Sequence, residues 1–439
     1  DTRPFEVRGE VLDLCKNHCK LRMAEVGGET VAYGFLCGRD LEQERFVSSN
    51  RSGFDLLRAR KKHFRVKAGE RRRKVRIGLP AALHVLSDLD FWKAFFAELG
   101  VEVVTSQGLG EAVVEGKRLA GAEFCAPMSA WHAHVASLKD RADYIFTPLY
   151  LEAEHERGSR RQYCYYTQYS PALIGTMQIE GLAERCLSPL LHIGERKFDG
   201  IGRLHDGLRP AFGKDLSLAE VQAAWQKASD MRDERLASWP SVMEQQLQEH
   251  EDVAVVLLGR PYTLWSEDMS RGIVDILAAQ GIEQDMLVPE ESPEIAGLIK
   301  QVHWQHSKRI LGLADQVARR PGLYPLLITS FKCGPDACTL EYFRRIMNRH
   351  GKPYLVLQLD EHDSQVGYET RIEAAVRAFR NHLSGTRPAE TRRTLPLVPE
   401  YTRQLDGQVL LVPAWDTLGS PLFVAALQRQ GFDTRLIRE

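Results

Sequence analysis

The sequence lacks the features that mark several large classes of protein. Its 439 residues hold no apolar run near the ~20 residues that a membrane-spanning helix needs, and the polar start from Asp1 to Glu10 is unlike a signal peptide. Charge of one sign is missing as well, because 58 Lys and Arg are balanced by 59 Asp and Glu. Nucleic-acid-binding proteins usually carry a basic excess. We therefore expect no membrane and no nucleic acid as partners, and the cytoplasm as the location.

Nucleotide-binding motifs are also missing. Gly108-Leu-Gly110 lacks the third glycine of a dinucleotide fingerprint, and the stretch from Gly110 to Arg118 has one residue too many for a phosphate loop. Arg118 also stands where that loop has Ser or Thr to hold magnesium. Any coupled ATP hydrolysis must therefore take place in another domain or another protein.

Cysteine is sparse, and no Cys-x-x-Cys pair occurs. At 44% hydrophobic and 27% charged residues the chain has a globular composition, and its length predicts at least two domains with their own cores. Such a chain does not need disulfides, so cysteines that gather would indicate a metal site or redox chemistry. The eight cysteines are Cys15, Cys19, Cys37, Cys125, Cys164, Cys186, Cys333 and Cys338.

Apolar runs alternate with helical patterns in two parts of the chain. Strand-like runs at 75–79 and 101–105 flank a helical pattern at 88–99, and this order is typical of a parallel sheet. A continuous apolar run at 253–258 is typical of a strand buried on both faces. We therefore predict an α/β protein with two doubly wound parallel-sheet lobes facing a cleft, with a small cysteine-marked N-terminal segment and helical insertions. Further strands are expected at 144–147, 326–329, 354–357, 407–412 and 434–437, and helices at 270–280, 295–311 and 421–431.

The same patterns divide the chain into six segments. The run of basic residues between the first two predicts a solvated linker, with a docking surface for an acidic partner as the alternative. The two lobes look like a loose duplication, although no residue-level repeat is visible. A start without Met and an unfinished last unit lead us to expect a piece of a longer protein. The segments are a cysteine segment (1–57), a basic linker (58–74), a first α/β lobe (75–180), a helical connector (181–251), a second α/β lobe (252–390) and the start of a further α/β unit (391–439).

Three cysteines fall near predicted strand ends. Cys333 directly follows the strand at 326–329, at the sheet edge where open α/β folds bind ligands. Cys125 and Cys164 lie in loops that could reach a similar edge. The Gly-Pro turn after Cys333 is suited to aim a thiolate and to expose backbone N–H groups. A space-filling role is the alternative, which we prefer for Cys186 and leave open for Cys338.

Arg260 follows the predicted strand at 253–258. Its guanidinium could hold an anionic group such as a phosphate, or pin a loop by bonding carbonyl oxygens, and the sequence favours neither. His303 and His306 are separated by about one helical turn, but no nearby acids complete a metal shell. We interpret these two histidines as core or surface residues.

An acidic loop follows the predicted strand at 354–357. Glu361 and His362, between Asp360 and Asp363, are suited to acid–base catalysis or to tuning a metal centre through hydrogen bonds. The alternative is a simple helix N-terminal cap. We keep Arg260, Glu361 and His362 as the candidate catalytic residues.

A set of motifs spread over nearly the whole chain supports a family resemblance. They are Ile77-Gly-Leu-Pro-Ala-Ala-Leu83, Phe124-Cys125-Ala-Pro127 with His132-Ala-His134, Cys164 with Gln168 and Pro171, Gly259-Arg-Pro-Tyr262, and Thr329-Ser-Phe-Lys-Cys333-Gly-Pro-Asp336. Together they resemble the acyl-CoA dehydratase activase-related family, akin to the iron–sulfur subunits of 2-hydroxyacyl-CoA dehydratases and to benzoyl-CoA reductase-type systems.

This resemblance implies two sets of metal ligands. Cys125, Cys164 and Cys333 match positions that hold a [4Fe–4S]-type cluster with one iron left open. Tyr165 departs from the pattern, since related segments often have Pro after the cysteine. At the amino terminus, Cys15, Cys19 and Cys37 match a set that would bind a second cluster or zinc, and His18 is available as a fourth zinc ligand.

The resemblance also implies a function. It predicts an oxygen-sensitive iron–sulfur component, dehydratase-like (a lyase) or reductase-like, for ATP-coupled low-potential electron transfer or for reductive or dehydrating chemistry on a CoA thioester. The partners would be an activase-type ATPase domain, in the same longer chain or in a separate protein, and an acyl-CoA substrate. The alternative is a non-catalytic scaffold, stabilised by zinc or a cluster, that docks the ATPase activator.

Overall fold

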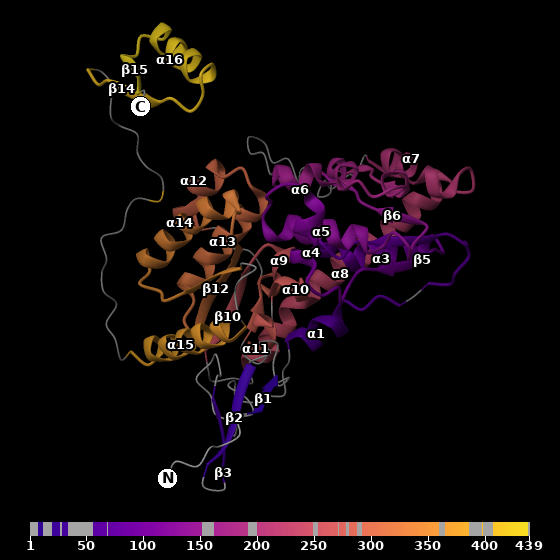
Figure 1. The fold of residues 1–439 in the computed structure, drawn as a ribbon, viewed down its shortest axis with the longest axis horizontal. Coiled ribbons are helices and arrows are strands. Elements are labelled where there is room, and N and C mark those ends of the chain that lie inside the picture. Colours follow the sequence, from indigo (N-terminus) through magenta and orange to yellow (C-terminus); the bar gives the residue numbers. More distant parts are fainter. Residues whose placement is uncertain are drawn as a thin grey trace. The chain divides into compact units, whose positions relative to one another are not determined.

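The computed structural model divides the chain into two compact units, residues 1–397 and 398–439, which are described separately. Figure 1 draws the fold and labels many of its helices and strands. The described residues are 8–11, 20–26, 29–33, 56–67, 69–151, 162–191, 200–248, 253–270, 272–277, 281–287, 292–359, 365–385, 397 and 407–437.

The first described strands form a small antiparallel sheet. Its strands are β1 (Arg8–Val11), β2 (Lys20–Val26) and β3 (Glu29–Tyr33), paired in that order. The alternating sequence at 29–33 predicts β3.

A helix occupies the beginning of the stretch expected to be a basic linker. In α1 (Leu56–His63), Leu56 is fully buried. Arg60 binds the buried Glu283 with an Nε–Oε1 distance of 3.2 Å. The first turns of this basic stretch are therefore packed against the second lobe.

The arginines farther along the same stretch close the end of a helix. Arg72 and Arg73 donate to the carbonyl oxygens of Glu98 and Leu99, at the C-terminal end of α3 (Leu89–Glu98). Cations stabilise this end of a helix, where carbonyl groups lack partners within the helix. These two arginines are thus bonded to the folded lobe, although Arg72 itself is exposed to solvent.

The first lobe is built on a parallel sheet with strand order β5-β4-β6-β8. The central strand is mostly buried, as the apolar run at 75–79 predicts. The strands are β4 (Arg76–Leu79), β5 (Glu102–Thr105), β6 (Tyr144–Phe146) and β8 (Cys186–Leu187), and a separate parallel pair is β7 (Leu149–Tyr150) with β9 (Leu190–Leu191).

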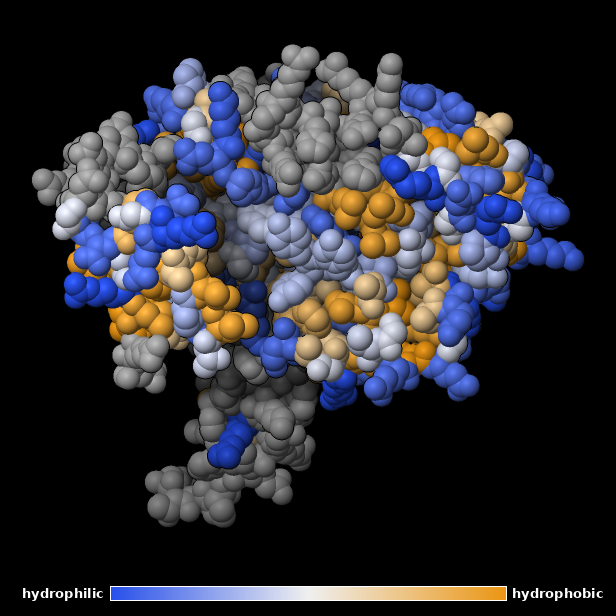
Figure 2. All heavy atoms as spheres, turned by 90° about the horizontal axis from the view of Figure 1, so that it is seen from above, coloured by the Kyte–Doolittle hydropathy of each residue, from blue (hydrophilic) through white to orange (hydrophobic). Residues whose placement is uncertain are grey.

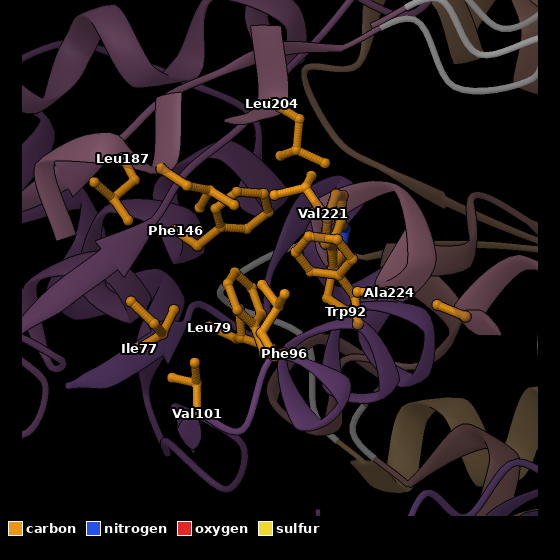
Figure 3. Packing of buried hydrophobic residues seen from close by; sticks show 14 of the residues in the cluster. Ile77, Leu79, Trp92, Phe96, Val101, Phe146, Leu187, Leu204, Val221 and Ala224 are labelled. Carbon is orange, nitrogen blue, oxygen red and sulfur yellow. The ribbon is translucent and has the colours of Figure 1, made fainter. Parts of the chain in front are cut away.

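Aromatic and aliphatic side chains pack together in the core of this lobe (Figure 3). Trp92 and Phe96 of α3 face Phe146 of β6, with ring centroids 4.5 and 5.2 Å from that of Phe146. Leu204 and Val221 belong to the same cluster, so the segment expected as a helical connector is packed into the first lobe. The remaining helices are α2 (Leu83–Ser87), α4 (Ala112–Ala120), α5 (Ala126–Ala136), α6 (Tyr165–Tyr169), α7 (Ile201–Phe212) and α8 (Leu218–Gln248), with 3-10 turns η1 (Ser170–Met177) and η2 (Ala183–Arg185).

The second lobe repeats this plan with strand order β11-β10-β12-β13, again parallel throughout. Every residue of the two central strands is buried, as a continuous apolar run predicts. The strands are β10 (Ala254–Gly259), β11 (Gly281–Glu283), β12 (Leu323–Ser330) and β13 (Leu355–Leu359); the helices are α9 (Pro261–Leu264), α10 (Glu267–Ser270), α11 (Ile273–Ile276), α12 (Pro293–Gln301), α13 (Gln305–Arg319), α14 (Gly334–Arg349) and α15 (Gln365–Leu383), with the 3-10 turn η3 (Gln284–Met286).

Both sheets therefore have the same strand order, with the second strand on one side of the first and the third on the other. Because parallel crossovers are right-handed, this reversal places successive connections on opposite faces. The α/β prediction of two parallel-sheet lobes is confirmed, and the shared order gives the loose duplication a structural basis. Ligands of such sheets bind at the carboxyl ends of the strands, where the order reverses.

Two helix predictions in the second lobe need correction. The helix expected at 295–311 is split into α12 and α13, because Trp304 instead forms a parallel bridge with Gln162. Of the helix expected at 270–280, the described residues contain one short helix, α11 (Ile273–Ile276). Hydrogen bonding to a distant strand-like segment interrupts a helix that apolar periodicity alone would continue.

The second unit is a short α/β fragment. β14 (Leu410–Pro413) pairs in parallel with β15 (Thr434–Ile437), and α16 (Gly419–Arg429) connects them. These match the strands and the helix predicted near the end of the sequence.

The face in Figure 2 mixes hydrophilic (blue) and hydrophobic (orange) side chains. Within the part of the chain that the structure describes, no helix is long and apolar enough to cross a membrane.

Candidate functional site

Each of the three predicted ligand cysteines stands at the beginning of a helix. Cys125 is the N-cap residue of α5, Cys164 that of α6 and Cys333 that of α14. Pro127 and Pro335 occupy the first turns of α5 and α14, where proline is well tolerated. A helix N-terminus offers free N–H groups and partial positive charge, so it favours a thiolate over a thiol.

The structure brings these cysteines into one neighbourhood. A negative charge on Cys164 would raise the pKa of Cys125, and a charge on Cys125 would raise that of Cys333. Cys125 and Cys164 come from the first lobe, whereas Cys333 comes from the second. Loops separated by more than 160 residues therefore meet here, since Cys164 and Cys333 lie 169 positions apart (333 − 164).

Burial is the largest influence on two of these thiols. It raises the pKa of Cys125 and of Cys333, although the backbone N–H groups of Met128 and Asp336 donate to their sulfurs and act in the opposite direction. Both thiols are therefore protonated at neutral pH when nothing is bound. A metal that binds here must displace protons, so its affinity rises with pH.

The three cysteines do not form a preformed metal site in this structure. Among the described residues, no group of three or more His, Cys, Asp or Glu side chains stands where it could hold a metal ion. Ligands of a single zinc would all lie about 2.3 Å from it, whereas the cysteines of a cluster bind different irons and stand farther apart. Backbone N–H groups directed at two of the sulfurs are the kind of contact that tunes iron–sulfur clusters.

Arg260 lies beside the cysteines and is almost completely buried. Its Nε donates to Asp336 Oδ1 at 2.9 Å, and its Nη1 donates to Tyr262 Oη at 3.0 Å. Thr329 Oγ1 donates to the other oxygen of Asp336 at 2.7 Å. Arg260 thus pins the first turn of α14, but it does so through a carboxylate and not through the carbonyl oxygens that we considered.

One nitrogen atom of Arg260 has no hydrogen-bond acceptor in this network. Nη2 of Arg260 is buried and lies 2.8 Å from Asp336 Oδ1, but its N–H groups do not point at an acceptor. Burial alone would lower the pKa of Arg260, but the charges of Asp336, Tyr262 and Cys333 raise it. The guanidinium therefore stays charged and keeps an N–H group suited to an anionic ligand or a thiolate.

The turn that carries Arg260 depends on a close approach of two strands. A Cβ on Gly259 would lie 2.7 Å from the carbonyl oxygen of Ile328 in the neighbouring strand β12. Glycine is therefore required where β10 ends, which explains the first residue of the Gly-Arg-Pro-Tyr motif.

Several residues of this neighbourhood were not predicted from the sequence. His84 and Thr167 are buried and bonded to each other, and Tyr262 of the second lobe is buried in a cluster of first-lobe residues. Lys332, with a left-handed φ of 63°, forms an ion pair with Glu123 across the two lobes. Only the position of Lys332 directly before Cys333 could have suggested a role.

Exposed aromatic rings surround two of the cysteines. Tyr165, Tyr166 and Tyr169 of α6 are each more than half exposed, and so is Phe331, two residues before Cys333. The ring of Tyr166 also contacts that of Phe124, next to Cys125. Tyr165, which stands where related sequences often have Pro, therefore places an exposed ring next to Cys164.

A small pocket of about 20 Å³ lies between the ends of β4 and β5 and residues 265–268 of the second lobe. His134 lines it and is bonded to Ser106 Oγ at 2.8 Å. Burial lowers the pKa of His134 to about 4, so the ring is neutral. At this size the pocket admits about one water molecule.

The remaining predicted residues have separate places. Burial raises the pKa of Cys186 to about 12, in keeping with a packing role, and Cys338 is exposed on α14. His303 is exposed and His306 carries a buried ring nitrogen. The other candidates lie outside the described residues: Cys15, His18, Cys19, Cys37, Asp360, Glu361, His362 and Asp363.

Residues 76–287 match the family described as the CoA enzyme activase uncharacterised domain. This region belongs to an acyl-CoA dehydratase activase-related family. The match spans the first lobe and the second lobe as far as β11, so it includes Cys125, Cys164 and Arg260. The activase-related resemblance is thereby confirmed, and it relates the chain to acyl-CoA dehydratase activation. The likeness to iron–sulfur subunits stays a prediction. No curated protein matches the chain.

Proposed function

We propose that this activase-related chain is an iron–sulfur protein whose [4Fe–4S]-type cluster is held by Cys125, Cys164 and Cys333. It takes part in ATP-coupled low-potential electron transfer, or in reductive or dehydrating chemistry on a CoA thioester. The observation that carries the proposal is the meeting of three helix N-cap cysteines from both lobes beside a buried arginine.

The cluster would supply an electron and an open iron for a ligand. The residues of the chain would stabilise the bound thiolates and orient the ligand. Helix N-termini stabilise the negative charge of the bound thiolates. The N–H groups of Met128 and Asp336 donate to two of the sulfurs. Arg260 keeps a charged donor in the same space, where it orients an anionic group.

The partners follow from what the sequence lacks. No phosphate loop is visible, so an activase-type ATPase, in the same longer chain or in a separate protein, would supply the energy for electron transfer. The substrate would be an acyl-CoA. Five free cysteines among the described residues suit the reducing cytoplasm.

One observation favours a second candidate, a non-catalytic scaffold that docks the ATPase activator. The metal-free thiols of Cys125 and Cys333 have raised pKa values because they are buried. Buried, protonated thiols are typical of cysteines that fill space. In this scaffold, zinc or a cluster at the N-terminal cysteines would stabilise the fold.

The test is anaerobic purification followed by measurement of iron, acid-labile sulfide and the electron paramagnetic signal after reduction. The wild type is expected to be brown and to contain both iron and sulfide. Cys333→Ser should keep the fold but lose absorbance and signal, because a hydroxyl is a poor replacement for a ligand thiolate. Cys186→Ser is the matched control and should keep both.

Two other outcomes would favour the scaffold over the iron–sulfur protein. Full iron content and an unchanged signal in Cys333→Ser would exclude the three-cysteine site. A colourless wild type that contains zinc would leave the thiols with a structural role only.

A further inference from the structure

Cys164 stands on the shortest of the three helices at the site. α6 has five residues, and an isolated helix of this length is not stable in water. The Cys164 side chain makes no capping hydrogen bond to the helix. Other contacts must therefore fix the direction in which its thiol points.

A relay of two hydrogen bonds holds Cys164 from within the first lobe. Thr167 Oγ1 donates to the carbonyl oxygen of Cys164 at 2.8 Å. His84 Nε2 lies 3.1 Å from the same hydroxyl oxygen. Because a hydroxyl has only one proton to donate, His84 must be the donor of the second bond. His84 and Thr167 are each 5% exposed, so water does not compete for either bond.

The ring of His84 is fixed in position and in charge. It stacks on Tyr150 with centroids 4.8 Å apart and contacts Tyr163 at 4.2 Å and His306 at 5.8 Å. Burial, and then the positive charge of Arg260, lower the pKa of His84 to about 3. The imidazole is therefore neutral at physiological pH and keeps its tautomer with a proton on Nε2.

The second lobe holds the same segment two residues before Cys164. The N–H of Gln162 donates to the carbonyl oxygen of His303 at 3.0 Å, and the N–H of Gln305 donates back to Gln162 at 2.9 Å. Tyr165 and Trp304 add a ring contact at 5.2 Å. This parallel bridge is the one that separates α12 from α13.

We infer that His84 and Thr167 are positioning residues for Cys164, which they orient against a backbone clamp supplied by the second lobe. Cys125 and Cys333 cap longer helices, of 11 and 16 residues, which depend less on such outside contacts. The orientation of Cys164 consequently depends on contact between the lobes. The inference rests on the proposed function only for the role of Cys164 as a ligand.

The test measures the thiol itself, in the full chain without metal. Iodoacetamide alkylation of each cysteine is followed by mass spectrometry, with Cys186 as the internal reference. Thr167→Val removes both hydrogen bonds at nearly constant volume, and it should increase the alkylation rate of Cys164 about fivefold, the factor that one net hydrogen bond supplies. Thr167→Ser keeps the hydroxyl and should restore the wild-type rate.

The matched control is Thr176→Val. Thr176 makes the same kind of bond, from Oγ1 to the carbonyl oxygen of Leu173 at 2.6 Å, but it is exposed and makes no bond to the Cys164 backbone. This variant should leave the rate at Cys164 unchanged. His84→Leu should act like Thr167→Val, whereas His84→Gln retains an N–H donor and should act like the wild type.

The outcomes separate this inference from the proposed function. An unchanged Cys164 rate in Thr167→Val, or an equal increase at Cys186, overturns the positioning role whatever the iron content. A selective increase at Cys164 supports it. If that increase is seen in a protein that binds no iron under anaerobic reconstitution, positioning stands and the cluster proposal fails.

Discussion

Arg260 and Asp336 form a buried ion pair, with Nη2 and Oδ1 2.8 Å apart and the two side chains 4% and 8% exposed. The pair joins the end of β10 to the first turn of α14, three residues after Cys333. Each charge is compensated by its partner; Arg260 also donates to Tyr262 Oη, and Asp336 also accepts from Thr329 Oγ1. The site therefore depends on a contact between residues 76 positions apart in the sequence.

Asp336→Leu should destabilise the protein strongly. It leaves the charge of Arg260 buried without a partner, and breaking a buried pair in this way costs about 3–5 kcal/mol. Urea unfolding measures the loss. Arg260→Met combined with Asp336→Leu should recover most of the stability, because neither charge is then buried alone. A double variant as unstable as the single one would show that the pair is not the cause.

Trp92 should be the most sensitive core position of the first lobe. It is fully buried, and its Nε1 donates to Tyr150 Oη at 2.5 Å. Trp92→Ala is expected to cost about 3–5 kcal/mol in thermal or urea unfolding, since it leaves a large cavity. Tyr150→Phe keeps the ring but removes this hydrogen bond and the one between Tyr150 and Asp88, so it should cost less than Trp92→Ala. Equal losses in the two variants would contradict the packing explanation.

His84 should make the protein sensitive to acid. Burial lowers its pKa from the ordinary value of 6.5 to about 3 in the folded chain, so between these values the unfolded state binds the extra proton. Stability contributed by the neutral ring is complete above pH 6.5 and falls as the pH decreases toward 3. At about pH 5 the loss is about 2 kcal/mol relative to about pH 7.5.

Urea unfolding at these two pH values measures the effect. His84→Gln keeps the N–H donor but cannot titrate, so its stability should differ less between the two pH values than that of the wild type. The same pH dependence in both proteins would assign the acid sensitivity to other groups.

Ser217 and Glu220 form a capping box at the start of α8. Glu220 N–H donates to Ser217 Oγ at 3.2 Å, and Ser217 N–H donates to Glu220 Oε2 at 2.9 Å. Ser217→Ala should cost about 1 kcal/mol in urea unfolding. The same variant should raise the pKa of Glu220, which the N–H and hydroxyl of Ser217 help to lower to about 2. Ser241→Ala within the same helix is the control and should stay within about 0.5 kcal/mol of the wild type.

Deletion of residues 1–45 tests the N-terminal cysteines, which lie outside the described residues. We expect Cys15, Cys19 and Cys37 to form a metal site of their own. The deletion should then remove part of the bound metal and leave the share of Cys125, Cys164 and Cys333. Loss of all metal would mean that the two sets contribute to one common site.

Much of the fold could be predicted because local patterns and burial agree. The apolar runs at 75–79 and 253–258 are the central strands β4 and β10, since only a strand buried on both faces is apolar throughout. The break between α12 and α13 could not be predicted. It depends on hydrogen bonds from Gln162 to a segment more than 140 residues away, since its bridge partner is Trp304 (304 − 162 = 142).

The candidate site shows the same division. The position of Cys333 at a strand end and the glycine and arginine of Gly259-Arg260 follow from the sequence, because a parallel sheet binds ligands at its carboxyl edge. Asp336 as the partner of Arg260 was not predicted. Neither was the relay from His84 through Thr167 to Cys164, since nothing in the local sequence of these residues marks them as neighbours.

The sequence by itself determined two parallel-sheet lobes and the strand end at which Cys333 stands, because backbone propensity and apolar periodicity act over a few residues. Only the tertiary structure decided which side chains meet between the lobes. Such contacts depend on how two sheets of the same strand order pack together, with Tyr262 of one lobe buried in the core of the other. A buried charge or N–H group is stable only beside its partner, and that partner is brought there by the fold.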